Sequence, residues 1–113
     1  DCPVVGYIGD GSYLYYPQSM YTAARYDLDL NIVIPEKRNY RILKDNTAAL
    51  IGGDHEDYEY VGMDFDPPVD IVANAKSHGT EGEFVSEPDE IDAALSRSLD
   101  TDGPFVVDVL IED

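Results

Sequence analysis

Residues 3–12 read PVVGYIGDGS, a short apolar run that passes directly into two glycines flanking one aspartate. An apolar run of this length followed by glycine predicts a buried strand that enters a tight turn. Pro17 suits the first turn of a helix, and apolar residues follow it at helical spacing. A second apolar run at 31–34, ended by Pro35, predicts the next strand. Strand, turn, helix and strand within about thirty-five residues have the proportions of a βαβ unit.

The alternation of helices and strands continues to the end of the chain. The pattern predicts a helix over 39–50, with Ile42 and Leu43 in the core, and then a long acidic loop over 52–68. A helix over 69–78 is expected next, ended by Gly79, followed by a strand over 83–85. Ser86 is expected to cap a helix that runs to Leu99, and the last strand is expected over 105–111. The last strand, FVVDVLI, is apolar almost throughout, which is typical of a strand buried on both faces of a parallel sheet. We therefore predict a single α/β domain over residues 1–113, an open, mostly parallel sheet with helices on both faces.

The charge of the chain excludes several classes of partner. Its 113 residues carry 24 acidic and 7 basic side chains, a net charge of −17. A surface this acidic repels the phosphates of nucleic acids and anionic lipids, so binding to nucleic acid or to a membrane surface is not expected. No apolar run in these residues approaches the roughly 18 residues of a membrane-spanning helix, and a leader of the signal-peptide kind is not expected. A single cysteine cannot form an internal disulfide, and the expected location is cytoplasmic.

The acidic residues lie almost wholly in the second half of the sequence. Residues 1–50 carry six acids and five bases, whereas residues 51–113 carry 18 acids and two bases. Acid-rich, lysine-poor surfaces suit concentrated salt, where screening removes self-repulsion. An acidic docking surface for a basic partner is the alternative. We favour salt adaptation, because the acids are scattered among apolar positions and do not form a tail.

The glycine-rich turn is the candidate binding site. In open parallel sheets, ligands bind at the carboxyl ends of strands, where residues 9–12 are expected to lie. Glycines at 9 and 11 let backbone N–H groups approach an anion, and the carboxylate of Asp10 suits a divalent cation that bridges it to phosphate oxygens. Asp-Gly-Ser is also an ordinary turn, so these four residues alone leave both interpretations open.

The context of the turn resembles one family. Gly9-Asp10-Gly11 is similar to the diphosphate-binding motif of thiamine-diphosphate-dependent enzymes, in which an Asn-Asn pair follows the next strand. Residues 22–28 (TAARYDL), 38–43 (RNYRIL), 66–71 (DPPVDI), 75–79 (AKSHG) and 103–109 (GPFVVDV) also resemble that family, and the similarity covers essentially the whole chain. The acetolactate synthase and benzoylformate decarboxylase branch is the most similar.

The resemblance assigns roles to individual positions. It implies that Asp10 is a Mg²⁺ ligand, that Gly9, Gly11, Ser12 and Tyr40 meet thiamine diphosphate, and that the backbone carbonyl of Asn39 completes the metal shell. The Asn-Asn pair falls on Glu36 and Lys37, with Lys37 at the metal-ligating asparagine. A charged ammonium has no lone pair for a cation, which puts Mg²⁺ binding in doubt.

Three interpretations of this departure are open. Glu36 swings in as the oxygen ligand, Lys37 neutralises the diphosphate directly and takes over part of the metal's charge, or the site has lost its cofactor.

The function implied by the resemblance is the thiamine-diphosphate- and Mg²⁺-binding region of a 2-oxo-acid decarboxylase or carboligase. The resemblance also implies that the N-terminal part of the domain is missing, that the remaining segments belong to the same enzyme, and that the enzyme forms a homo-oligomer. No residue corresponds to the family's activating glutamate, so the isolated chain is expected to hold no catalytic residue. The alternatives are a degenerate, non-catalytic assembly domain and, last, a nucleotide-phosphate binder, for which a glycine-rich fingerprint is lacking.

Overall fold

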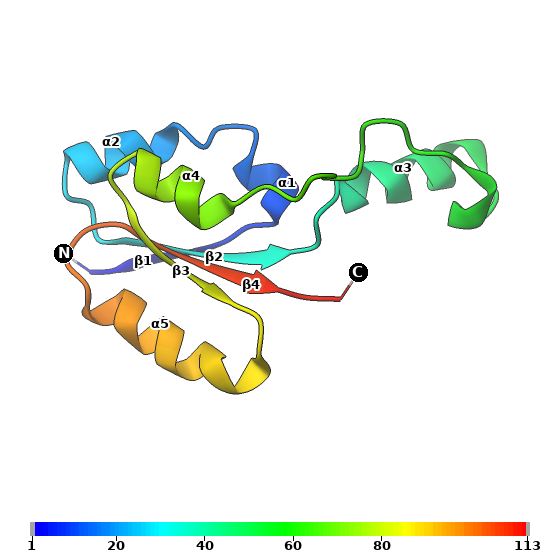
Figure 1. Cartoon of the computed structure of the whole chain (residues 1–113). Coiled ribbons are helices and arrows are strands. Elements are labelled where there is room, and N and C mark those ends of the chain that lie inside the picture. The colour runs from blue at the N-terminus through cyan, green and yellow to red at the C-terminus, as the bar shows by residue number, and fades with distance from the viewer. Residues whose placement is uncertain (1, 113) are drawn as a thin grey trace.

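Four strands form one parallel sheet in the computed structural model, which describes residues 2–112. They are β1 (Val4–Tyr7), β2 (Leu30–Glu36), β3 (Glu81–Val85) and β4 (Phe105–Leu110), and they lie in the order β1-β2-β4-β3 (Figure 1). All three neighbouring pairs are parallel. Because both β1 and β2 end at the same edge of the sheet, the chain segments that follow them are brought together there.

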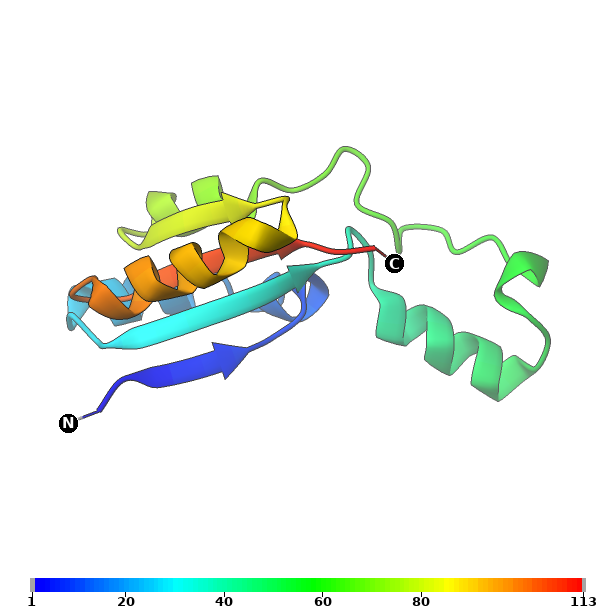
Figure 2. The same cartoon turned by 90° about the horizontal axis from the view of Figure 1, so that it is seen from below.

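Helices cover both faces of the sheet. Helices α1 (Asp10–Tyr13), α2 (Ser19–Arg25) and α4 (Ile71–Ser77) lie on one face, and α5 (Ile91–Asp100) lies on the other (Figure 1). Helix α3 (Arg41–Ile51) projects beyond the end of the sheet and contributes no buried residue, as both views show (Figure 2). The predicted fold class, an open parallel α/β sheet with helices on both faces, is confirmed.

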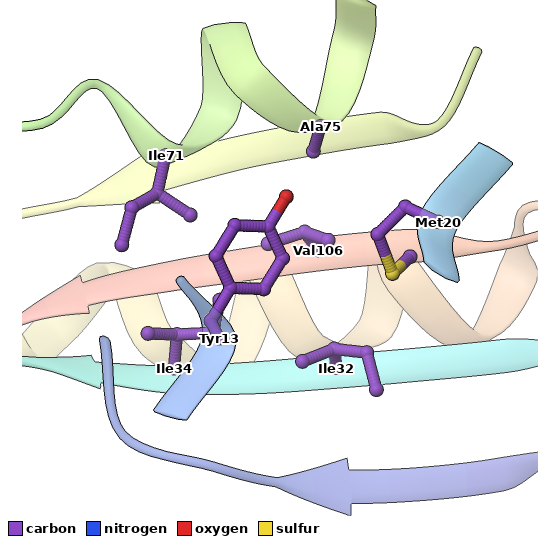
Figure 3. Packing of buried hydrophobic residues seen from close by; sticks show 7 residues of the cluster. All are labelled: Tyr13, Met20, Ile32, Ile34, Ile71, Ala75 and Val106. Carbon is purple, nitrogen blue, oxygen red and sulfur yellow. The ribbon is translucent and has the colours of Figure 1, made fainter. Parts of the chain in front are cut away.

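The core consists of two apolar layers, one on each face. Alternation along β2 and β4 sends Ile32, Ile34 and Val106 toward α1, α2 and α4, where Tyr13 and Ile71 pack on them (Figure 3). On the other face, Phe105, Val107 and Val109 pack with Val85 of β3 and Ala94 of α5. The same alternation places Asp108 on the face of Val106 and Glu36 on the face of Ile34. Two carboxylates therefore lie at the carboxyl end of the first layer.

Several predicted boundaries were wrong. Strand β2 runs through Pro35 to Glu36, because β1 ends opposite Val33 and leaves an edge at Pro35, the kind of position where a sheet tolerates proline. The turn at residues 9–12 opens the short helix α1. Ser86 does not cap the helix as expected. The 3₁₀ turn η2 (Pro88–Glu90) leads into α5, and the residue at the N-cap of η2 is Glu87.

The other expectations on the second half of the chain were met in part. The loop over 52–68 contains the 3₁₀ turn η1 (His55–Asp57) and an isolated antiparallel bridge from Asp64 to Asn39. Helix α4 begins at Ile71, two residues later than expected, because the Oδ1 of Asp70 accepts a 2.9 Å bond from the backbone N–H of Ala73. Gly79 ends that helix at a φ of 85°, a conformation that glycine adopts without strain. Within residues 2–112, none of the helices is long and apolar enough to cross a membrane.

Candidate functional site

A cavity of about 150 Å³ lies where β1 and β2 end. It is lined by seven of the eight residues that the sequence selected, namely Gly9, Asp10, Gly11, Ser12, Lys37, Asn39 and Tyr40. These residues come from two segments that more than twenty positions separate in sequence. Parallel pairing of β1 with β2 is what brings the two segments together, since each follows its strand at the same edge.

Asp10 connects the two segments. Its side chain is 2 % exposed, and its Oδ2 accepts hydrogen bonds from the backbone N–H groups of Lys37 at 2.9 Å and Arg38 at 2.5 Å. Its Oδ1 accepts a 2.9 Å bond from the backbone N–H of Gly11. A carboxylate oxygen has two lone pairs, so Oδ2 is saturated by these bonds and Oδ1 keeps one lone pair for a further donor or a cation.

The turn after β2 has an unusual backbone that these bonds stabilise. Arg38 adopts a φ of 60°, in the left-handed region that non-glycine residues rarely occupy. The side-chain amide of Asn39 donates a 2.9 Å bond to the carbonyl of Lys37 and closes the turn from the other side. Both bonds to Oδ2 come from residues of this turn, so the position of Lys37 depends on the carboxylate of Asp10.

Gly11 is required because an aromatic ring lies directly against it. A Cβ at this position would lie 2.7 Å from Cδ1 of Tyr40 and 3.7 Å from the backbone oxygen of Asn39. The ring of Tyr40 also makes an edge contact with Phe65, with centroids 4.8 Å apart. The Asn39 carbonyl thus lies beside Gly11, and Asn39 lines the same cavity as Asp10, so this cavity contains two of the three residues that the resemblance implies for a metal.

Glu36 does not join the other predicted residues. It lines a second cavity, together with Arg38, Asp70 and Asp108, and its side chain is 3 % exposed. Glu36 is the last residue of β2 and keeps the alternation of that strand, whereas Lys37 lies past the strand end. The two residues of the Asn-Asn position therefore serve different cavities.

In the second cavity, burial and mutual repulsion disfavour the charged form of the carboxyl groups. Burial, with added repulsion from the carboxylates of Glu36, Asp10 and Asp70, raises the pKa of Asp108 to about 7, although Arg38 opposes the shift. Burial likewise raises the pKa of Glu36, against the opposing charge of Arg38. Buried carboxylates are costly unless they are paired, so this cavity as described favours a proton or a cation.

Tyr15 and Arg41 also line the first cavity, although the sequence did not select them; Ile42 lines it too, a residue for which core packing was preferred over a place bordering the substrate space. The expectation that Ile42 packs in the core is wrong, because it is 67 % exposed at the start of the projecting helix α3. Tyr15 lies three residues after Ser12, and its ring centroid is 6.0 Å from that of Tyr40. The spacing of Tyr15 from the glycine motif was the signal that could have selected it.

An open parallel sheet with a glycine–aspartate turn at the carboxyl ends of two adjacent strands defines a cofactor- or phosphate-binding α/β domain. Residues 1–109 match the family model described as thiamine pyrophosphate enzyme, C-terminal TPP binding domain, and the chain belongs to that family.

Similar proteins include two enzymes of known sequence. The chain is 27% identical to the acetolactate synthase isozyme 2 large subunit of Escherichia coli over 110 residues, which cover 97% of this chain and 19% of that protein. It is 28% identical to the benzoylformate decarboxylase of Pseudomonas aeruginosa over 106 residues, 94% of this chain and 19% of that protein. The chain thus spans about a fifth of the length of these relatives.

Solved structures agree with this assignment. The thiamine diphosphate-dependent 4-hydroxybenzoylformate decarboxylase of Rhodococcus jostii superposes with a TM-score of 0.85 at 28% identity, over 99% of this chain and 20% of that one. The benzoylformate decarboxylase of Polynucleobacter necessarius gives a TM-score of 0.84 at 32% identity, over 97% of this chain and 20% of that one. The expected family and its thiamine-diphosphate-binding domain are confirmed.

Proposed function

We propose that this chain is the diphosphate-anchoring region of a thiamine-diphosphate-dependent 2-oxo-acid decarboxylase or carboligase that works as a homo-oligomer. The observation that carries the proposal is the single cavity formed by Gly9–Ser12 and the turn after β2. A Cβ on Gly9 would meet no atom within 4 Å, so space is open beside the motif. Ser12 is exposed and Lys37 half-buried at this cavity, and a hydroxyl and an ammonium are both donors for a diphosphate.

The chain's own residues bind and orient, and none of them is assigned a catalytic role. When bound, thiamine diphosphate supplies the electron sink for decarboxylation of a 2-oxo acid. Gly11 and Ser12 would hold its diphosphate, and Lys37 would neutralise part of the negative charge. Tyr40, fixed by its contact with Phe65, would form one wall of the site.

The donor set fits a Mg²⁺ ion only in part. Asp10 Oδ1 keeps a lone pair, and the Asn39 carbonyl lies beside Gly11. Mg²⁺ is commonly held by one or two carboxylates with phosphate oxygens and waters, which these two groups could satisfy. Glu36 lies in the other cavity, which weighs against the interpretation that it enters the metal shell. Lys37 would therefore supply part of the positive charge that the metal ion supplies in the family.

A non-catalytic assembly domain is the second candidate. The observation that favours it is the Glu36-Lys37 pair, which replaces both asparagines of the resemblance with residues of opposite charge. On this alternative, the parallel sheet and the exposed helix α3 serve subunit association, and thiamine diphosphate does not bind.

Calorimetric titration distinguishes the cofactor-binding region of an enzyme from a non-catalytic assembly domain. The full-length protein is titrated with thiamine diphosphate in molar KCl, with and without Mg²⁺. We expect saturable binding that persists without Mg²⁺, because Lys37 supplies a fixed positive charge at the diphosphate. Thiamine without the diphosphate is the control ligand and should bind far more weakly. Absence of binding under both conditions would exclude the enzyme function and leave the assembly domain.

We also propose that the protein works in the cytoplasm at high salt. With 24 acidic against 7 basic side chains, ion pairs within the chain can neutralise only a minority of the carboxylates. Raising salt from 0.1 to 1 M shortens the screening length from about 10 Å to about 3 Å, which removes most of the repulsion.

The melting temperature of the full-length protein is therefore expected to rise with KCl. The expected increase between 0.1 and 2 M is on the order of 10 °C, because screening removes the repulsion between the carboxylates. Sucrose at equal osmolality serves as the control for general exclusion effects. A melting temperature that stays level or falls with KCl would refute salt adaptation.

A further inference from the structure

The second cavity, the Glu36–Asp108 cavity, lies at the carboxyl ends of β2 and β4 and has a volume of about 300 Å³. Three of its lining side chains are carboxylates, those of Glu36, Asp70 and Asp108, and one is the guanidinium of Arg38. None of the cofactor-binding residues proposed above lines it. It is therefore a separate site with a net negative charge.

Two of these carboxylates are buried with an oxygen that no hydrogen bond satisfies. Asp108 is 2 % exposed and Glu36 is 3 % exposed. Among the described residues, neither Oδ1 of Asp108 nor Oε2 of Glu36 accepts a hydrogen bond, and the Nε of Arg38 is 3.6 Å from the latter. Buried polar oxygens nearly always accept a hydrogen bond in native proteins. We therefore expect both oxygens to accept one from a donor that residues 2–112 do not provide.

The single cation of the cavity is not placed to satisfy all three acids. The side chain of Arg38 is 42 % exposed and forms an ion pair with Glu36. Asp70 is exposed and already accepts the capping bond from Ala73. Asp108 faces no arginine or lysine in any ion pair of the described residues. A second cation would neutralise the pair formed by Asp108 and Glu36.

The shape and chemistry of the walls select the kind of cation. Within the described residues, no three Asp, Glu, His or Cys side chains are placed to share a metal ion, but two buried carboxylates of this cavity each have an oxygen without a hydrogen-bond donor. The remaining walls are apolar and come from Pro68, Val69 and Phe84, the last of which is 46 % exposed. A guanidinium on an aliphatic stem satisfies both features, since it donates to two carboxylates at once and packs its flat face on an aromatic ring.

We propose that the Glu36–Asp108 cavity is a docking socket for an arginine side chain presented by a second polypeptide surface. Charge complementarity carries the assignment, because two buried acceptors without donors face an opening with apolar walls. The inserted guanidinium donates to Asp108 and Glu36, and its methylene stem covers Phe84. Docking of this kind fixes the partner surface at the end of β4, close to the cofactor cavity but outside it.

Protection of arginine from chemical modification tests the proposal in the full-length protein as purified. The probe is phenylglyoxal, and the modified arginines are identified by peptide mass spectrometry. In the wild-type protein, one arginine other than Arg38 should be protected. In Asp108→Asn, which removes the charge and keeps the shape, it should react roughly tenfold faster, as expected for the loss of a charged hydrogen bond.

Matched variants keep the test decisive. Asp92→Asn removes an equal charge from an exposed site on α5 and should leave the protection unchanged. Phe84→Ala alters only the apolar wall, at an exposed side chain that the core does not need, and should expose the same arginine if Asp108→Asn fails to fold. Unchanged reactivity of every arginine in both cavity variants, or a response of Arg38 alone, would overturn the proposal. The proposal would also be overturned if added agmatine bound one-to-one while no arginine was protected, because the ligand of the cavity would then be a free small-molecule amine and not an arginine side chain.

Discussion

Asp10→Ala is expected to lower the free energy of unfolding by roughly 3 kcal/mol and to abolish binding of thiamine diphosphate. The carboxylate accepts bonds from the backbone N–H groups of Lys37 and Arg38, and each buried donor left without an acceptor costs about 1–3 kcal/mol. The same bonds stabilise the turn in which Arg38 has a positive φ, so the turn that carries Lys37 should relax when they are lost. Urea unfolding followed by circular dichroism measures the first effect, and calorimetry measures the second.

Two companion variants separate structure from binding. Asp10→Asn should be almost as damaging, because both carboxylate oxygens accept bonds and an amide offers only one acceptor. Ser12→Ala changes an exposed residue of the same helix, so it should weaken cofactor binding and leave the unfolding free energy close to wild type. Wild-type stability in Asp10→Ala would show that the turn after β2 does not depend on this carboxylate.

Lys37→Ala is expected to lower the affinity for thiamine diphosphate in Mg²⁺-free buffer by roughly 10- to 100-fold. A hydrogen bond to a charged group contributes about 1.5–3 kcal/mol, and an ammonium placed at the diphosphate supplies such a bond. Lys76→Ala, which removes an equal charge from an exposed position near the end of α4, is the control and should bind as the wild type does. The measurement is the calorimetric titration described above.

Lys37→Asn gives the result that distinguishes charge replacement from loss of the site. An asparagine at this position supplies a neutral oxygen ligand beside Asp10 and Asn39, so binding should become dependent on Mg²⁺. If Lys37→Ala binds thiamine diphosphate as tightly as the wild type does without Mg²⁺, then Lys37 is not the group that neutralises the diphosphate.

On these two proposals, cofactor anchoring and partner docking use separate cavities. The cofactor cavity takes its residues from the segments that follow β1 and β2, and the Glu36–Asp108 cavity takes its residues from β2, β3, β4 and the segments that follow β2 and precede α4. The turn after β2 contributes to both, because Lys37 lines the first cavity and Arg38 the second, and Asp10 accepts hydrogen bonds from the backbone N–H groups of both residues. A partner arginine docked at Glu36 would therefore act on the same turn that positions Lys37.

Much of this fold could be predicted from the sequence because its signals are local. The apolar run 105–111 indicated a buried parallel strand, and Gly79 indicated the end of a helix. The boundaries that were wrong depended on neighbours in space. Pro35 stays within β2 because β1 ends two residues earlier, and no pattern around Pro35 reports where another strand ends.

By itself, the sequence determined the fold class, the family and the group of residues around Gly9-Asp10-Gly11 that share one cavity. Chain order and strand burial are enough for this, because parallel strands deliver their following turns to one edge. Only the tertiary structure decided that Glu36 and Lys37, adjacent in the chain, serve different cavities. It also decided that Asp108, which reads as one polar residue in an apolar strand, lies buried with Glu36. The physical reason is that side-chain direction and the pairing of charges depend on strand register and packing, which no single segment of the sequence contains.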